Sequence, residues 1–185
     1  MATARQPKHA TIDDLYKTPG KAELVNGELI LMPPIGATPG QAAIEIVVSL
    51  HTYAKRTGRG RAVGDNVGFL VNLPDRQSFS PDATFWSGND PGMKFYDGAP
   101  VFAVEVRSES DYGPLAERNM AVKRADYFAA GTQVVWDVDL LGDDVVRVYR
   151  ADNPNTPILY RRGDNAEAEP AVPGWSMAVD DLFVD

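Results

Sequence analysis

The sequence predicts a single α+β domain, in which a mixed central β-sheet is flanked by helices. Its 185 residues suffice for one domain with a sizeable core but not for two comfortable ones. Helical and strand-like segments follow one another along the chain, which favours helices packed on a mixed sheet. The segment 101–107 is apolar almost without interruption, as is typical of a buried central strand. We therefore expect one domain over residues 11–185, preceded by a flexible tail over residues 1–10.

The N-terminal third contains the signals of a short helix, a hairpin and a long helix. Thr11 is a suitable N-cap for the short helix, because acidic residues follow it in the first turn. Asn26-Gly27 separates two apolar segments, 22–25 and 28–32, and this dipeptide suits the type I′ turn of a β-hairpin. The segment 38–57 has a broad apolar face at helical spacing, so it predicts a long helix.

The remainder of the chain predicts strands, one further helix and three loops. The second long helix is predicted over 114–130, and Gly131 ends it because glycine favours the left-handed conformation there. Strands are predicted at 66–71, 80–86, 101–107, 133–139, 145–149 and 158–160. Loops are predicted at 74–80, 87–100 and 163–173, which are rich in polar residues, glycine or proline. A short apolar segment is expected to close the domain at 175–183.

The composition excludes several kinds of chemistry. The chain has no cysteine, which excludes disulfides, a thiolate nucleophile and cysteine-based metal centres. His9 and His51 do not have the spacing of a metal-binding pair, so a histidine-rich site is not expected. No apolar segment approaches the roughly 20 residues that cross a bilayer, and the N-terminus lacks the apolar segment of a secretory signal. We therefore expect a cytoplasmic protein with no membrane partner.

The net charge of −8 is concentrated in the C-terminal quarter. Residues 137–185 contain 11 acidic and 4 basic side chains, whereas residues 1–136 contain 15 and 14. One basic cluster stands out, and it consists of Lys55, Arg56, Arg59 and Arg61. It is either a solvated helix end or a contact for phosphate groups. Proteins that coat duplex DNA are usually basic overall, so a nucleic-acid role would here be local, metal-assisted or weak.

Two carboxylates stand out by their positions. Asp82 opens a predicted strand, and Glu105 lies late in the buried strand 101–107. Ionised carboxylates are rarely tolerated in such a strand unless they are paired or bound to a cation. If the two strands are neighbours, Asp82 and Glu105 could converge on a hard divalent cation such as Mg²⁺. The alternative is a structural ion pair between Glu105 and either Arg107 or Lys123.

Asp82 and the segment Glu105–Arg107 form the skeleton of the nuclease signature PD-x(n)-(D/E)-x-K. Further motifs are the helical segment 119–131, the strand 135–139 that follows it, and the N-terminal sequence ELVNGEL at 23–29. In this order and spacing the motifs resemble the Uma family of restriction-endonuclease-like proteins, over nearly the whole chain. The resemblance implies a restriction-endonuclease-like fold, here with an N-terminal β-hairpin extension.

The resemblance also implies a function and the roles of three residues. It implies a divalent-metal-dependent endonuclease that hydrolyses phosphodiester bonds of nucleic acid, with DNA as the expected substrate. Asp82 and Glu105 would hold Mg²⁺ or Mn²⁺. Lys123, on the following helix, would stand near the attacking water or the scissile phosphate. Enzymes of this kind often pair two active sites, so a homodimer is expected.

Departures from the family pattern support a second interpretation. The family usually has aspartate where this chain has Asn119, and it usually has Ser-Pro-Ser where this chain has Ser108-Glu109-Ser110. The alternative function is therefore that of a catalytically degenerate nuclease-fold module, which binds nucleic acid or protein without cleaving it.

Several other side chains have open roles. Glu23 and Glu28 flank the hairpin turn, and exposed hairpin charges are the favoured interpretation of both. Gln41 stands where the family often has histidine, and Glu45 lies where related nucleases sometimes carry a further acidic ligand. The sequence leaves open whether Glu28, Gln41, Glu45 or Arg107 contributes to the site.

Overall fold

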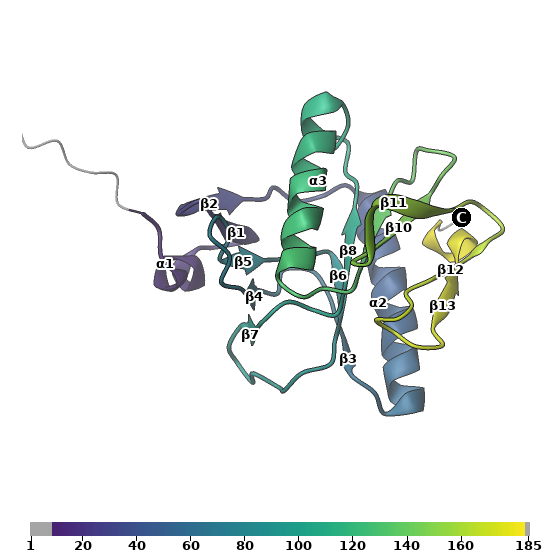
Figure 1. Cartoon of the computed structure of the whole chain (residues 1–185), viewed down its shortest axis with the longest axis horizontal. Helices are drawn as coiled ribbons and strands as arrows, with labels where there is room; N and C mark the ends of the chain where they lie inside the picture. The colour runs from purple at the N-terminus through teal and green to yellow at the C-terminus, as the bar shows by residue number, and fades with distance from the viewer. Residues whose placement is uncertain (1–8, 184–185) are drawn as a thin grey trace, which may run out of the picture.

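The computed structural model describes residues 9–183, and its centre is a six-stranded mixed sheet (Figure 1). The strands lie in the order β11-β10-β9-β8-β6-β3, in which β8 and β9 are parallel and all other neighbours are antiparallel. In chain order they are β3 Arg61–Val63, β6 Ala83–Trp86, β8 Phe102–Val106, β9 Val134–Val138, β10 Val146–Arg150 and β11 Asn153–Tyr160. The mixed central sheet predicted from the sequence is confirmed.

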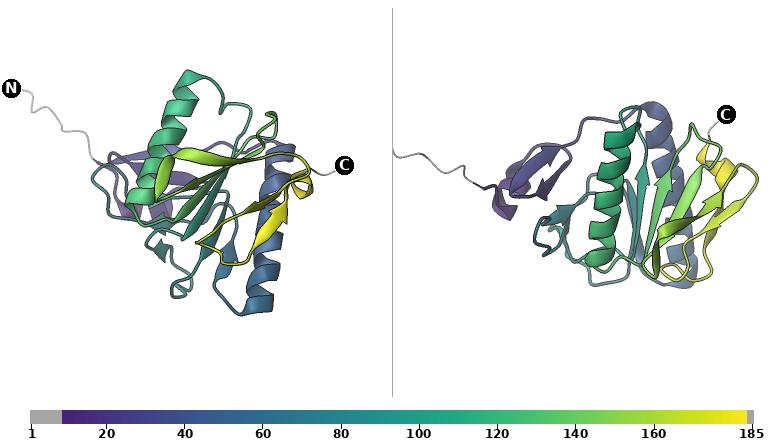
Figure 2. Two further views of the ribbon diagram at one scale, coloured as in Figure 1. Left: turned by 45° about the vertical axis from the view of Figure 1, so that its right-hand side comes forward. Right: turned by 45° about the horizontal axis from the view of Figure 1, so that its top comes forward.

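Two long helices cover opposite faces of this sheet (Figure 2). They are α2, Ala37–Thr57, and α3, Pro114–Ala129, and both agree with the predicted helices to within one residue at each end. Successive residues of a strand point to opposite faces. Val104 of β8 accordingly packs in the core on the α2 side, whereas Ala103 packs with residues of α3. Glu105 has the same parity as Ala103, so its side chain lies on the α3 side of the sheet.

Local chemistry sets the ends of the N-terminal elements as predicted. Thr11 caps the short helix α1, Ile12–Lys17, through a capping box. Asn26 and Gly27 have φ angles of 52° and 73°, and a type I′ turn needs positive φ at both central positions. The turn joins β1, Ala22–Val25, to β2, Glu28–Leu31.

The N-terminal hairpin docks on a small three-stranded sheet in the order β5-β4-β7. Those strands are β4 Phe69–Leu70, β5 Ser78–Phe79 and β7 Tyr96–Asp97. The N–H of Asn26 donates to the carbonyl of Asp75 at 2.8 Å, and the N–H of Gln77 donates to the carbonyl of Leu24 at 2.9 Å. One side of the hairpin is therefore covered by residues that come much later in the chain.

Three short strands lie in segments that the sequence predicts as loops. They are β5, β7 and β12, Asn165–Glu167. The predicted strand at 66–71 is reduced to the two residues of β4, and β3 has no counterpart among the predicted strands. Strands of two or three residues are too short to show an alternating pattern. They form here because the tertiary fold brings their pairing partners alongside.

The C-terminal segment packs into the core on the α2 side. It forms β13, Ser176–Ala178, and the short 3₁₀-helix η1, Val179–Leu182. The ring of Trp175 lies 5.1 Å from that of Trp136 and 5.7 Å from that of Phe102. Within residues 9–183 there is no helix with the length and apolar character that crossing a membrane requires.

The predicted flexible tail is only partly within the described residues. Residues 1–8 lie outside them. The N–H of Ala10 donates to the carbonyl of Gly27 at 2.8 Å, so the end of the predicted tail is tied to the hairpin.

Candidate functional site

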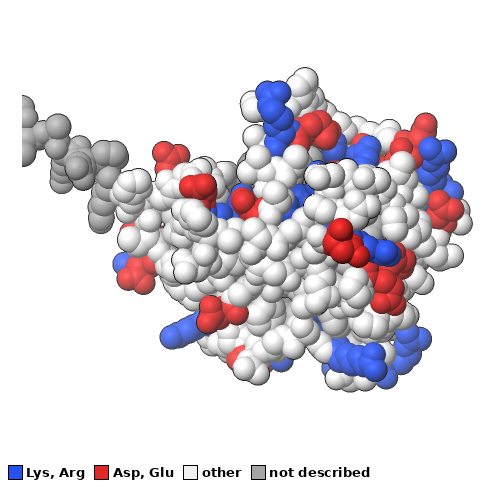
Figure 3. Space-filling model, in the orientation of Figure 1, with Lys and Arg blue, Asp and Glu red and all other residues white. Residues whose placement is uncertain are grey.

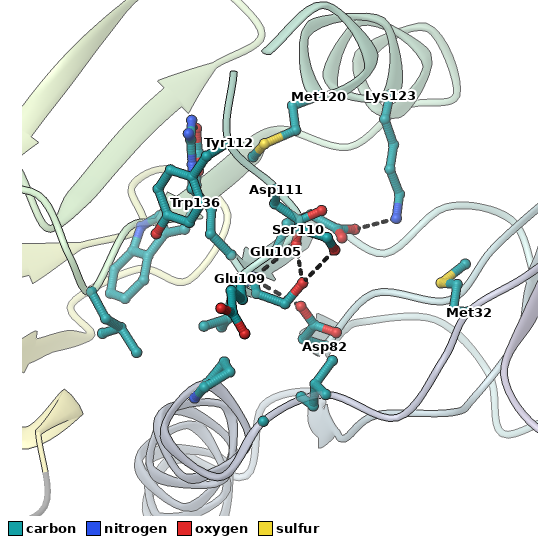
Figure 4. A pocket seen from close by; sticks show the side chains of 18 of the residues that line it. Met32, Asp82, Glu105, Glu109, Ser110, Asp111, Tyr112, Met120, Lys123 and Trp136 are labelled. Atoms are coloured by element: carbon teal, nitrogen blue, oxygen red, sulfur yellow. Dashed lines mark hydrogen bonds and ion pairs between the residues drawn. The ribbon is translucent and has the colours of Figure 1, made fainter. Parts of the chain in front are cut away.

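The sheet register places Asp82 and Glu105 together. β6 and β8 are antiparallel, with Ala83 opposite Val104. Continuing this register by one residue places Asp82, which directly precedes β6, opposite Glu105. Side chains at directly opposite positions on one face have Cβ atoms roughly 4.5–5.5 Å apart. Both carboxylates line the same cavity, as Figure 4 shows.

Asp82 is buried and both of its carboxylate oxygens have partners. Oδ2 accepts a hydrogen bond from the N–H of Val106 at 2.7 Å. Oδ1 lies 2.6 Å from the Nζ of Lys21, which directly precedes β1. The same Nζ lies 2.6 Å from Oδ1 of the exposed Asp65. Lys21 therefore bridges one buried and one exposed carboxylate.

Glu105 has two donors on one oxygen. Its Oε1 accepts a hydrogen bond from the hydroxyl of Tyr127 at 2.6 Å and lies 2.8 Å from the Nζ of Lys123. Burial raises the pKa of Glu105. Lys123 opposes this effect, but the nearby carboxylates of Asp82 and Glu23 add to it, so the pKa stays above its ordinary value. Burial and Glu105 raise the pKa of Tyr127 as well, so the phenol keeps its proton and donates.

Lys123 projects from α3 into the cavity and contacts two carboxylates. Besides Glu105, its Nζ lies 2.9 Å from Oε1 of Glu23 (Figure 4 shows the lysine directed toward Glu105). Burial alone would lower the pKa of Lys123, but Glu105 and Glu23 outweigh burial and raise it above its ordinary value. Lys123 is therefore a permanent cation near neutral pH and not a proton acceptor.

The prediction that Glu23 is an exposed hairpin charge is wrong. Glu23 is 3% exposed, its Oε1 accepts from the N–H of Ser80 at 2.9 Å, and its Oε2 lies 2.5 Å from Nη1 of Arg76. The reason is the docking of the hairpin on the later segment, which covers this side of β1. Burial disfavours the charge, but Lys123 and Arg76 outweigh it and lower the pKa of Glu23. Glu28, in contrast, is exposed as predicted.

Sequence reasoning missed Lys21, Glu23 and Arg76 as parts of this cluster. Arg76 is buried. It contacts Glu23, and its Nε also lies 2.8 Å from Oδ2 of Asp126 in α3. Lys21 and Glu23 are two residues apart, the spacing that places side chains on one face of a strand. That spacing was the available signal for the hairpin residues. Arg76 lies in a segment predicted as a loop, where no pattern marks it.

Arg107 does not pair with Glu105. Its Nε and Nη2 both lie 2.7 Å from the two carboxylate oxygens of Asp137, and it also binds Glu117 of α3. Of the two structural ion pairs that the sequence leaves open for Glu105, the one with Lys123 is formed. Arg107 stands two residues after Glu105, where the signature has its lysine, but its guanidinium is held by other carboxylates.

The cavity has a volume of about 980 Å³, and its lining includes Asp82, Glu105, Arg107 and Lys123. Glu28, Gln41 and Glu45 are not among its lining residues. The basic cluster of Lys55, Arg56, Arg59 and Arg61 does not line it either. Basic side chains gather over the lower end of α2 in Figure 3, and the cluster belongs to this end and the start of β3.

The two carboxylates fit a magnesium or manganese ion that the protein holds with only part of its ligand shell. Within residues 9–183, no group of three or more histidine, cysteine, aspartate and glutamate side chains is arranged to hold a metal. Asp82 and Glu105 are two opposed carboxylates. Mg²⁺ is commonly held by one or two carboxylates, and waters and substrate phosphates complete its octahedral shell. The pair therefore suits an ion completed by water and substrate, and it does not suit an all-protein cage.

A mixed sheet with a long helix on each face, and an acidic pair with a lysine on one side of it, is the arrangement of restriction-endonuclease-like proteins. The chain belongs to the Uma2 family, described as "Putative restriction endonuclease", which matches residues 10–180. A similar solved structure is that of "a putative nuclease belonging to DUF820" from Anabaena variabilis ATCC 29413. The two share 18% sequence identity with a TM-score of 0.73, over 94% of this chain and 97% of that one. No curated protein matches this chain.

Proposed function

We propose that this protein is a divalent-metal-dependent nuclease that hydrolyses phosphodiester bonds of nucleic acid, with DNA as the substrate. The observation that carries the proposal is the position of Asp82, directly before β6, opposite Glu105 of the neighbouring strand β8. The Nζ of Lys123 lies 2.8 Å from Glu105. Membership of the Uma2 family supports nuclease activity, and the metal dependence and the DNA substrate are our additions to it.

Each residue has a distinct task in this proposal. Asp82 and Glu105 would hold Mg²⁺ or Mn²⁺, which supplies water activation and charge neutralisation at the phosphoryl group. Lys123 stays protonated, so it stabilises negative charge on a phosphate oxygen instead of accepting a proton. The hydroxyl of Tyr127 fixes the orientation of the Glu105 carboxylate through its hydrogen bond at 2.6 Å.

The proposal is tested with the purified protein on single-stranded DNA, duplex DNA and RNA. We expect degradation of DNA with Mg²⁺ or Mn²⁺ and none after a chelator is added, because the two carboxylates alone cannot activate water. Restoring the divalent ion should restore the activity. Degradation that continues in excess chelator would contradict the metal dependence, and no degradation of any substrate with either ion would contradict the nuclease function.

One observation favours the alternative function, a catalytically degenerate module that binds nucleic acid or protein. Each carboxylate of the candidate metal site already contacts a lysine, Asp82 through Lys21 and Glu105 through Lys123. The cluster is thus neutralised from within the chain. A module of this kind would bind its partner without metal-dependent turnover, which the same assay distinguishes.

A homodimer and a cytoplasmic location are further parts of the proposal, and both come from the sequence. Two active sites in a closed dimer would allow the two strands of a duplex to be cut together. Light scattering is expected to give twice the 20.1 kDa mass of one chain at micromolar concentrations. A monomer mass over the whole micromolar range would contradict the homodimer.

A further inference from the structure

Lys21 contacts one of the carboxylate oxygens with which Asp82 would hold a divalent ion. The N–H of Val106 uses one lone pair of Oδ2 of Asp82, and among the described residues Oδ1 has no backbone donor. Oδ1 is the atom that the ammonium of Lys21 contacts, at 2.6 Å. The lysine side chain is 12% exposed and that of Asp82 is 7% exposed, so bulk water screens this contact poorly.

Asp65 offers the same ammonium a second partner on the outer side. Its Oδ1 also lies 2.6 Å from Nζ of Lys21, and its side chain is 43% exposed. Burial disfavours the charge of Lys21, but Asp82, Glu105 and Asp65 outweigh burial and raise its pKa. Lys21 is therefore an ammonium with two carboxylates in direct contact, one in the candidate metal site and one outside it.

A divalent ion and an ammonium repel each other strongly at contact distance in a poorly screened site. The two cations therefore compete for Oδ1 of Asp82. Because Asp65 is already in contact with Lys21, the ammonium can release Asp82 without losing its last counter-charge. The geometry thus provides both a reason for the release and a place for the ammonium after it.

We propose that Lys21 and Asp65 form a cation-exchange pair that sets the metal affinity of the site. Lys21 neutralises Asp82 in the metal-free protein and keeps only its contact with Asp65 in the metal-bound protein. This inference rests on the proposed function, because it takes Asp82 and Glu105 as the metal ligands. It adds to that function Lys21 and Asp65, two residues that do not belong to the nuclease signature.

The test measures Mn²⁺ binding by isothermal titration calorimetry, without nucleic acid. Lys21→Met keeps the apolar stem and removes the charge, so we expect its affinity for Mn²⁺ to rise roughly tenfold or more. Asp65→Asn removes the second partner of Lys21, so Lys21 stays on Asp82 and the affinity should fall by a similar factor. Lys17→Met is the matched control, because Lys17 is an exposed lysine at the end of α1, and its affinity should equal that of the wild type.

The outcomes separate this inference from the proposed function. If the wild type binds Mn²⁺ and Lys21→Met binds it equally or more weakly, the exchange pair is wrong while the metal site stands. If the wild type binds no Mn²⁺, both are wrong. Should Lys21→Met not fold, a crystal structure of the wild type with Mn²⁺ decides the matter. Nζ of Lys21 on Asp65 alone would support the exchange, and Nζ still on Oδ1 of Asp82 would overturn it.

Discussion

Replacing Glu105 with glutamine is expected to lower the rate of phosphodiester hydrolysis about a thousandfold or more. Glutamine keeps the shape of the side chain, and its carbonyl oxygen can still accept the hydrogen bond from Tyr127. It lacks the negative charge that binds a divalent ion, and Asp82 alone then faces that ion. The measurement is the initial rate of DNA degradation with Mg²⁺, followed at matched protein concentrations.

The same substitution is expected to change thermal stability little, because it removes a costly buried charge but also one of the two carboxylates that Lys123 contacts. Burial raises the pKa of Glu105 in the folded protein, so its ionised form costs folding free energy. That cost is fully present above the folded-state pKa and disappears below the unfolded-state value. A neutral glutamine removes it at pH 7. A melting temperature close to that of the wild type, together with lost activity, would separate a chemical role from a structural one.

Glu28→Gln is the matched control for Glu105→Gln. It makes the same chemical change at an exposed position of the hairpin that does not line the cavity. Its activity and melting temperature should equal those of the wild type. A Glu105→Gln protein as active as this control would show that hydrolysis comes from another site or from a contaminating nuclease.

The parts of the fold that depend on local chemistry could be predicted from the sequence. The hairpin follows from Asn26-Gly27, the first long helix follows from its apolar spacing, and the end of the second follows from Gly131. Gly131 has a φ of 108°, a positive value that favours glycine. The short strands could not be predicted in the same way, because Phe69 pairs with both Phe79 and Tyr96 only after the chain has folded.

The residues of the candidate site also differ in whether the sequence alone could predict them. Asp82 and Glu105 are predicted from their positions in two strands and from the nuclease signature, and Lys123 is predicted from the family resemblance. The structure brings all three to one cavity. Their catalytic and metal-binding roles remain predictions. The two-residue spacing of Lys21 and Glu23 predicts that they share one face of the hairpin. It does not predict whether that face is covered, because a charged residue in a hairpin looks the same locally in both cases. Only the docking of the hairpin on distant residues decides which it is.

Arg107→Met is expected to lower the free energy of unfolding by about 3–5 kcal/mol. The side chains of Arg107 and Asp137 are 3% and 4% exposed, and the guanidinium binds both oxygens of that carboxylate. Removing the arginine leaves Asp137 buried, with Arg147 at 3.8 Å as the nearest described cation. The measurement is the midpoint of urea unfolding together with its slope.

Arg161→Met is the control for this stability prediction. Arg161 pairs with Asp144 at 2.8 Å, but its side chain is 65% exposed. An exposed pair of this kind contributes about 0–1 kcal/mol. A second variant, Arg107→Met combined with Asp137→Leu, removes both buried charges and should recover most of the lost stability.

The stability that the Arg107–Asp137 ion pair contributes indicates whether Arg107 is free to act at the candidate metal site. Arg107 ties the end of β8 to Asp137 of β9 and to Glu117 of α3, so it fixes the strand that carries Glu105. A large loss in Arg107→Met, recovered in the double variant, would show that the signature position of this chain has a structural task. Lys21 and Lys123 are then left as the cations that contact Asp82 and Glu105. If Arg107→Met loses no more stability than Arg161→Met, the guanidinium is not needed by the fold, and Arg107 becomes a second candidate for contacting the substrate phosphate.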